Sequence, residues 1–228
     1  MKTQIIATVG PSSSSIKVLK AMKKAGMDIA RINMKYASVS ECASLLEKLR
    51  ILKCKSLVDI LNVRMAGKVR HLGFDYIALA FTESAKQLKG LKKLLPKAKT
   101  IAKIETAKGV RNITEIIKAS NGVMVARGDL GRNVPLEKLP FFQKSIIKEC
   151  NKRKKFVVTA TEMLLSMTDS KEPTRAEVTD VANAVLDGSS ALMLSEETAI
   201  GKYPVESVAM MDRIVKGAEK AKRTLNKS

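Results

Sequence analysis

The sequence predicts an α/β fold, a (β/α)8 TIM barrel in which eight parallel strands close into a ring surrounded by helices. Eight short apolar or β-branched runs recur along the 228 residues, and a helical pattern follows each of them. The runs are nearly continuous in apolar residues, as is typical of parallel strands buried on both faces. They span residues 4–9, 28–34, 56–60, 76–81, 100–105, 122–126, 156–160 and 191–194. A doubly wound open sheet, which uses the same alternation, is the structural alternative.

The helical segments between these runs carry their own start and stop signals. Residues 12–15 are all serine and offer N-caps for a helix that Gly26 closes. Near the end of the chain, Thr174 and Glu177 have the spacing of a capping box, and Gly188 ends that helix. No segment between two strands is long enough to hold a large inserted domain. We therefore expect residues 1–228 to form a single barrel domain.

The composition favours a folded protein of the cytoplasm. Apolar residues make up 45% of the chain, which is enough to bury a sizeable core, and no apolar run reaches the roughly 18 residues that span a membrane. No signal peptide precedes the first predicted strand. Cys42, Cys54 and Cys150 are far apart and fit neither a disulfide framework nor a zinc site. The single histidine, His71, excludes mechanisms that need two imidazoles.

The charge is the unusual part of the composition. Forty-two lysines and arginines against 22 acidic residues give a net charge of +20, which favours anionic partners. Lysines concentrate in residues 84–99 and 152–155. We interpret these runs as solvated surface, with polyanion binding as the alternative. Nucleic acid is not expected as a partner, because three tyrosines, five phenylalanines and no tryptophan offer few surfaces on which bases could stack.

Polar residues gather where the predicted strands end, the edge at which barrel enzymes carry their chemistry. They include acids, bases and hydroxyls that come together only if the barrel closes. Such a set suits a divalent cation together with a phosphorylated or carboxylated ligand. The candidates are Arg31, Asn33, Lys35, Asp59, Lys103, Glu105, Arg127, Asp129, Thr159, Thr161 and Ser195.

Several of these residues lie in stretches with a distinctive sequence. Residues 3–12 read TQIIATVGPS, residues 25–33 read AGMDIARIN, and residues 123–131 read VMVARGDLG. The most specific stretch is PTRAEVTDVANAVLDG at residues 173–188. Together they resemble the catalytic barrel of the pyruvate kinase family over about residues 3–215.

This resemblance implies roles for individual residues. Glu105 and Asp129 match the carboxylates that hold the catalytic Mg²⁺ or Mn²⁺. Lys103 matches the lysine that stabilises the transferring phosphoryl group and the enolate, and Arg31 matches an arginine on the phosphate. Thr161 matches the threonine near the carbon that is protonated when enolpyruvate becomes pyruvate. The structural alternative is that these strand-end charges merely pair with one another.

The resemblance also implies binding residues around that centre. Arg127, Gly128 and Asp129 match the helix N-terminus that receives the substrate carboxylate through backbone N–H groups. Arg64 aligns weakly with a substrate-binding arginine. Ser195 lies on the nucleotide side. The ligands of the family's monovalent cation, K⁺, are matched by Asn33 and Asp59, with Lys35 at a third position.

The chain departs from the family in ways that bear on activity. We expect neither the lid domain that the family inserts after the third strand nor its C-terminal regulatory domain. Lys35 stands where a serine is expected, so its ammonium would replace K⁺; the alternative is that it points to solvent. Glu196 replaces a glycine, and Glu162 replaces a glutamine.

Three functions remain open from the sequence. The first is a lidless pyruvate kinase that transfers phosphate between phosphoenolpyruvate and ADP, giving pyruvate and ATP. The second is metal-dependent enolate chemistry on a 2-oxo acid, such as oxaloacetate decarboxylation, which needs neither lid nor nucleotide. The third is a non-catalytic binding protein or a subunit completed by a separate partner chain. A homo-oligomer is compatible with each of them, whereas a membrane partner is not expected.

Overall fold

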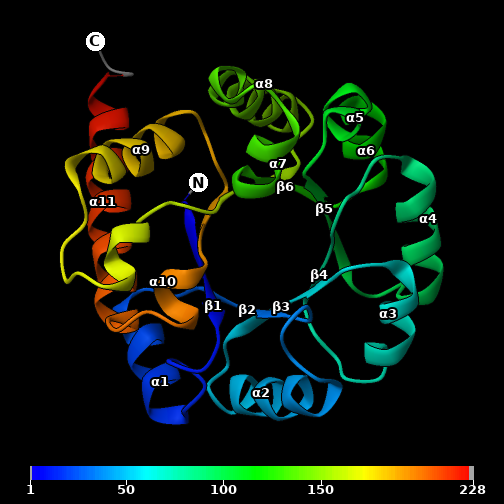
Figure 1. Ribbon diagram of the computed structural model, residues 1–228, viewed down its shortest axis with the longest axis horizontal. Coiled ribbons are helices and arrows are strands. Elements are labelled where there is room, and N and C mark those ends of the chain that lie inside the picture. Colours follow the sequence, from blue (N-terminus) through cyan, green and yellow to red (C-terminus); the bar gives the residue numbers. More distant parts are fainter. Residues whose placement is uncertain (1, 226–228) are drawn as a thin grey trace.

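The structure is a computed structural model that describes residues 2–225. Its eight strands form one closed barrel in the order β1 to β8, and every strand runs parallel to both neighbours. The ring closes where Gln4 of β1 pairs with Ala191 of β8. Figure 1 shows the ring with the helices around its outside. The predicted barrel is confirmed, and the open sheet is wrong because an open sheet leaves its edge strands unpaired.

The strands lie where the sequence predicts them, with bounds that differ by at most two residues. They are β1 (Gln4–Val9), β2 (Ile29–Asn33), β3 (Lys55–Ile60), β4 (Tyr76–Leu79), β5 (Lys99–Ile104), β6 (Gly122–Ala126), β7 (Phe156–Ala160) and β8 (Ala191–Leu194).

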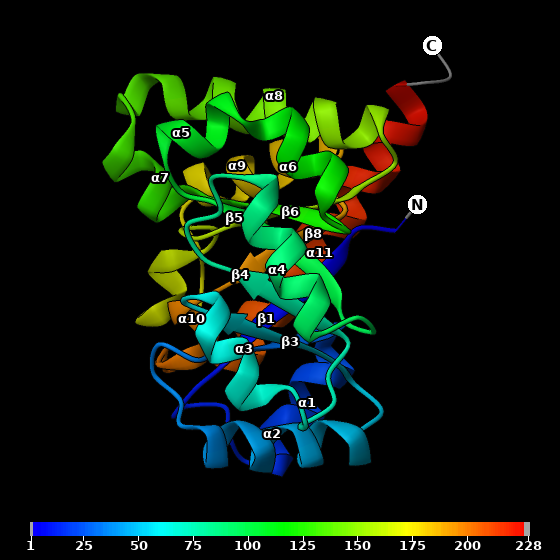
Figure 2. The same cartoon turned by 90° about the vertical axis from the view of Figure 1, so that its right-hand side faces the viewer.

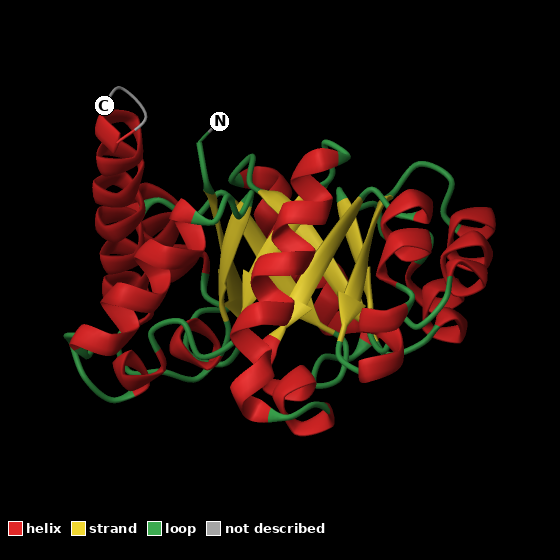
Figure 3. Cartoon of the chain, turned by 90° about the horizontal axis from the view of Figure 1, so that it is seen from above, coloured by secondary structure: helices red, strands yellow, loops and turns green. Residues whose placement is uncertain are grey.

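Helices surround the ring of strands, as Figures 2 and 3 show from two further directions. They are α1 (Ile16–Ala25), α2 (Val39–Ile51), α3 (Val63–Val69), α4 (Ala85–Leu94), α5 (Ala107–Arg111), α6 (Ile113–Ala119), α7 (Arg127–Asn133), α8 (Leu139–Lys152), α9 (Arg175–Leu186), α10 (Glu196–Ala199) and α11 (Pro204–Leu225), with 3₁₀ turns at Leu136–Lys138 and Leu165–Thr168. Within residues 2–225, no helix is both long and apolar enough to cross a membrane.

The capping signals predicted for the helices at residues 16–25 and 175–186 are present in the structure. Ser15 caps α1 by accepting a hydrogen bond from the backbone of Val18. The chain then leaves α1 through Gly26, whose φ of +124° favours glycine. Thr174 and Glu177 form the expected capping box at the start of α9. These local signals fix where each helix begins and therefore which face it presents to the barrel.

Side chains fill the barrel interior, so the barrel is a packed core and not a pore. The ring of Tyr76 stacks on that of Phe156, with centroids 6.0 Å apart. The interior cluster consists of Ile6, Ile29, Leu57, Tyr76, Ala78, Ile101, Met124, Val158, Ala160, Ala191 and Met193. This cluster fills the barrel interior toward the amino ends of the strands. The polar side chains gather toward the carboxyl ends.

The connection between β3 and β4 is short. Residues 61–75 contain only α3, whose N-cap is Asn62. No inserted domain therefore covers the ends of the strands at this point of the chain.

We predict that Leu57→Ala lowers the free energy of unfolding by about 2–5 kcal/mol, because Leu57 is fully buried in the barrel interior. Leu136→Ala is the matched control, since Leu136 is 70% exposed, and it should change that free energy by less than about 0.5 kcal/mol. Urea unfolding followed by circular dichroism measures both. Equal effects of the two substitutions would contradict the assigned packing.

Candidate active site

Four buried charges form a continuous ionic chain at the carboxyl ends of the strands. Arg31 on β2 donates from Nη2 to Oδ2 of Asp59 on β3 at 2.7 Å, and its Nε donates to the same oxygen at 3.0 Å. The ammonium of Lys103 on β5 lies 3.2 Å from that oxygen and 3.0 Å from Oε1 of Glu105. None of the four side chains is more than 11% exposed. The structure thus brings four predicted site residues together.

The strand sequences explain how Lys103 reaches Asp59, two strands away. β4 lies between β3 and β5, and Asp59 is paired across the sheet with Ala78. Ala78 in β4 and Ala80 just after it are buried and small, so they leave room for the Lys103 side chain to pass. Because side chains alternate along a strand, Lys103 and Glu105 both follow the same face of β5 and its continuation.

The ionic chain has two positive and two negative side chains, but the two carboxylate oxygens of Glu105 differ in their hydrogen bonds. Oε2 of Glu105 accepts the backbone N–H of Phe81 at 2.5 Å. Oε1 has the ion pair with Lys103 but receives no aligned hydrogen bond. Burial raises the pKa of Glu105, and the charge of Lys103 opposes that rise. A buried carboxylate oxygen without a full set of partners is a good ligand for a cation.

Asp129 is the second predicted carboxylate ligand. It lies in the first turn of α7, directly after β6, and β6 pairs with β5. Its side chain is 47% exposed, and the ion pair to Arg132 is long at 3.8 Å. Residues 2–225 hold no cluster of three or more Asp, Glu, His or Cys side chains that could bind a metal. Two carboxylates on neighbouring strands suit Mg²⁺, which keeps several positions for water and substrate oxygens.

Hydrogen bonds join the turn after β6 to the turn after β7. The backbone N–H of Gly128 donates to Oγ1 of Thr161 at 2.7 Å. The Arg127 guanidinium donates to the carbonyl of Thr161 at 2.6 Å and to Asp180 on α9 at 2.6 Å. Arg127 is 9% exposed, so its side chain positions these turns.

Thr161 has a strained backbone. Its φ is +71°, and the following Glu162 has a φ of +53°. A β-branched residue in the left-handed region is rare and costs about 1–3 kcal/mol. Such strain concentrates at functional sites. The hydroxyl of Thr161 donates to the carbonyl of Ala160 at 2.5 Å, so it is oriented by the turn itself.

Of the other predicted binding residues, Asn33 lies beside the ionic chain, because it pairs with Asp59 across β2 and β3, whereas Lys35 and Arg64 are exposed. Lys35 is exposed, and its ammonium lies over the ring of Tyr36, 5.4 Å from the centroid. Oδ1 of Asn33 accepts the backbone N–H of Lys35. Arg64 is exposed on α3. Because Arg31 and Lys103 already pair with Asp59, the structure favours the solvent-facing alternative for Lys35 and does not place its ammonium beside that carboxylate.

Sequence reasoning missed Glu197, which organises the other side of the barrel mouth. It is fully buried and accepts the backbone N–H groups of Leu164, at 3.0 Å, and Ser195, at 2.6 Å. Burial raises its pKa. The Ser195 hydroxyl is buried beside it without a hydrogen bond. The signal available in the sequence was the pair Glu196–Glu197 after β8, of which only the second is buried.

The sequence of the chain matches a known protein family over most of its length. A family model described as pyruvate kinase, barrel domain, matches residues 1–66 and 59–208. The chain belongs to the pyruvate kinase barrel family. The two matched segments meet at residues 59–66, where β3 leads into α3 and the connection is short.

Curated relatives named pyruvate kinase agree with this family. The chain is 54% identical to that of Thermococcus litoralis over 160 residues, which are 68% of this chain and 34% of the relative. It is 46% identical to that of Methanocaldococcus jannaschii over 165 residues, 71% and 36% of the two chains. The relative from Clostridium perfringens is 47% identical over 150 residues, 64% and 32% of the two chains. The chain thus spans about a third of the length of these pyruvate kinases.

We predict that Lys103→Met destabilises the protein by about 3–5 kcal/mol, because it leaves Glu105 buried without its cation. Lys108→Met is the matched control: Lys108 is 58% exposed and pairs with Glu83, so its loss should cost less than about 1 kcal/mol. Urea unfolding in the presence of a metal chelator measures both. A Lys103→Met protein as stable as the control would show that the ionic chain does not contribute to folding.

Proposed function

We propose that the protein catalyses Mg²⁺-dependent phosphoryl transfer between phosphoenolpyruvate and ADP, giving pyruvate and ATP. The observation that carries the proposal is the ionic chain ending at Glu105, whose Oε1 is buried and not fully partnered. Family membership supports the same reaction, because the curated relatives are named pyruvate kinase. We also propose that residues 1–228 act as one domain, in the cytoplasm, where buried free cysteines such as Cys42 and Cys150 remain reduced.

Glu105 and Asp129 would hold the divalent cation, Mg²⁺ or Mn²⁺. When bound, the cation neutralises charge on phosphoryl and enolate oxygens and orients them. Lys103 is held in place by Asp59 and Glu105, so its side chain would meet a phosphoryl group already ordered. Arg31 is fixed by Asp59 and by Thr8, whose Oγ1 accepts from Nη1 at 3.0 Å. These cations are therefore preorganised for an anionic substrate.

The reaction needs two bond changes that these residues would assist. The enol oxygen–phosphorus bond of phosphoenolpyruvate breaks, and a β-phosphate oxygen of ADP takes the phosphoryl group. The enolate that remains takes a proton at its methylene carbon and becomes pyruvate. The hydroxyl of Thr161 is the proposed route for that proton. In the structure it donates to the carbonyl of Ala160, so it must turn toward the substrate first.

The open mouth of the barrel bears on efficiency. Only α3 connects β3 with β4, and Asp129 is 47% exposed. Phosphoryl transfer depends on positioning and on exclusion of water. We therefore expect turnover to be slow and part of the phosphate to reach water in place of ADP. Ser195 is the proposed contact on the nucleotide side. Since Lys35 lies away from Asp59, no role in place of K⁺ is proposed for it.

A second function is favoured by the same short connection. Decarboxylation of oxaloacetate to pyruvate needs a metal-stabilised enolate but neither nucleotide nor lid. It would use Glu105, Asp129, Lys103 and Arg31. A separate partner chain that covers the mouth, or a homo-oligomer, is compatible with either reaction.

The test is pyruvate formation from phosphoenolpyruvate with Mg²⁺, with and without ADP, and in parallel from oxaloacetate. We predict ADP-dependent pyruvate formation that Lys103→Met lowers by more than about a hundredfold, since it removes the ammonium that faces the transferred group. The control Lys86→Met, on the exposed side of α4, should retain full activity.

The outcomes separate the proposed functions. Pyruvate from oxaloacetate alone, lost in Lys103→Met, would replace phosphoryl transfer by enolate chemistry. No pyruvate from either substrate in a folded wild-type protein would contradict catalysis by the isolated chain and favour a partner subunit.

A further inference from the structure

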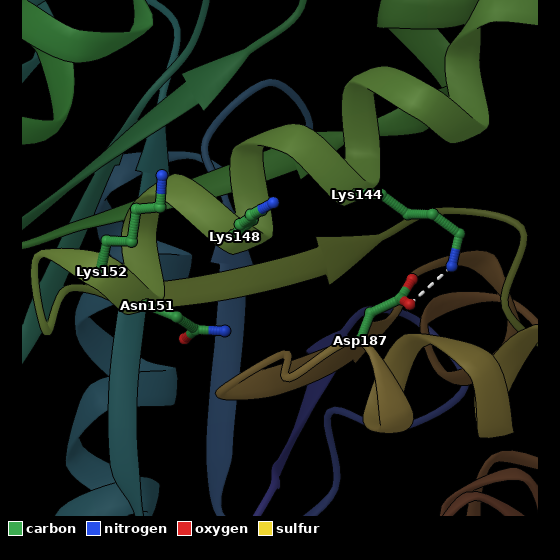
Figure 4. Close-up of a pocket in the computed structure, with 5 residues that line it drawn as sticks. All are labelled: Lys144, Lys148, Asn151, Lys152 and Asp187. Carbon is green, nitrogen blue, oxygen red and sulfur yellow. Dashed lines mark hydrogen bonds and ion pairs between the residues drawn. The ribbon is translucent and has the colours of Figure 1, made fainter.

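The opposite end of the barrel carries a basic groove that the proposed function does not use. It lies between α8 and the turn from α9 into β8, and Figure 4 shows the residues that line it. Asn151 and Lys152 come shortly before β7, and Asp187 comes shortly before β8. The groove therefore lies toward the amino ends of the strands, whereas the ionic chain lies at their carboxyl ends. Its lining residues are Lys144, Lys148, Asn151, Lys152 and Asp187.

Three of these lysines form a row along α8. Lys144, Lys148 and Lys152 are four residues apart, so they share one face of the helix, and Figure 4 shows them one after another along it. Eight residues of helix rise by about 12 Å, which is the length of the row. Like charges four residues apart repel and destabilise a helix. The helix carries this cost without an equal number of carboxylates nearby.

The acidic partners in reach do not neutralise the groove. Residues 144–155 contain six lysines and arginines and one acidic residue, Glu149. Glu149 pairs with Arg153 at 2.7 Å and more distantly with Lys152 at 4.0 Å. Asp187 holds Lys144 at 2.5 Å. Among the described residues, Lys148 and Lys154 have no ion pair within 4.0 Å, so the groove keeps an excess of positive charge.

Other basic residues at the amino ends of the strands add to the positive charge around the groove. Exposed basic residues also precede other strands at the same end, so the positive potential extends beyond the groove. They are Lys2, Lys23, Lys24, Lys53, Lys55, Arg70, Lys97, Lys99 and Lys118.

We propose that the groove binds an extended condensed phosphate, a chain of several linked phosphate groups. Three lysines spread over about 12 Å of helix axis suit several linked charges better than a single one, although Lys144 also pairs with Asp187. Among the described residues, no aromatic side chain lines the groove, so a nucleic acid base would find no ring to stack on. Lysine is a point-charge ligand for phosphate. The Asn151 amide donates one N–H to the carbonyl of Gly188 at 3.1 Å and has a second N–H to offer. The proposal does not depend on the catalytic function.

The probe is sodium tripolyphosphate, titrated into the full chain by isothermal calorimetry at low salt with a metal chelator present. The test variant is Lys148→Gln with Lys152→Gln. The matched control is Lys89→Gln with Lys93→Gln, which removes the same charge at the same spacing from exposed positions on α4. Binding of tripolyphosphate at the carboxyl ends of the strands would be the same in all three proteins, so it would not produce a difference between the two variants.

We expect the groove variant to bind tripolyphosphate at least about tenfold more weakly, because it loses two charge-assisted contacts, while the control changes less than about twofold. Both variants should melt within about 2 °C of the wild type, since the substituted side chains are exposed. Equal weakening in both variants, or no binding by the wild type, would overturn the proposal. So would a DNA duplex that binds the groove more tightly than tripolyphosphate does at equal phosphate concentration.

Discussion

The shared carboxylate of Asp59 is the interaction on which the candidate site depends. Its Oδ2 receives both Arg31 and Lys103, from strands on either side of it in the ring. A buried anion that holds two cations fixes both of their positions and leaves Lys103 to hold Glu105 in turn. Removing Lys103 would leave Glu105 buried without its cation, and removing Asp59 would leave Arg31 without its anion, so the site and the stability of this end of the barrel are coupled.

Other contacts at the carboxyl ends of the strands hold the turns around the ionic chain in place. Glu197 joins the turn after β7 to the turn after β8 through two backbone N–H groups. Arg127 joins α7, the Thr161 turn and α9. These contacts support the strained backbone at Thr161, which would otherwise relax. These contacts hold the site side chains in place without a covering domain. They do not exclude water from the site.

The fold was predictable because its signals are local. The apolar runs, the Ser15 and Thr174 caps and the glycine at 26 each act within a few residues, and the eight strands follow from them. The partners of the charges were not predictable in this way. Whether Lys35 or Lys103 lies beside Asp59 depends on the barrel closing and on small residues in β4 between them. Residue identity alone therefore indicated the correct strand ends but not the contacts among them.

Direct measurement of Mn²⁺ binding by electron paramagnetic resonance tests the central claim that Glu105, at the end of the ionic chain, is a ligand for a divalent cation. Glu83 is the control, since it is also near a strand end but pairs with Lys108 at the surface. The account predicts that Glu105→Gln weakens Mn²⁺ binding more than about tenfold, while Glu83→Gln leaves it unchanged. Unaltered Mn²⁺ binding by a folded Glu105→Gln protein would contradict it.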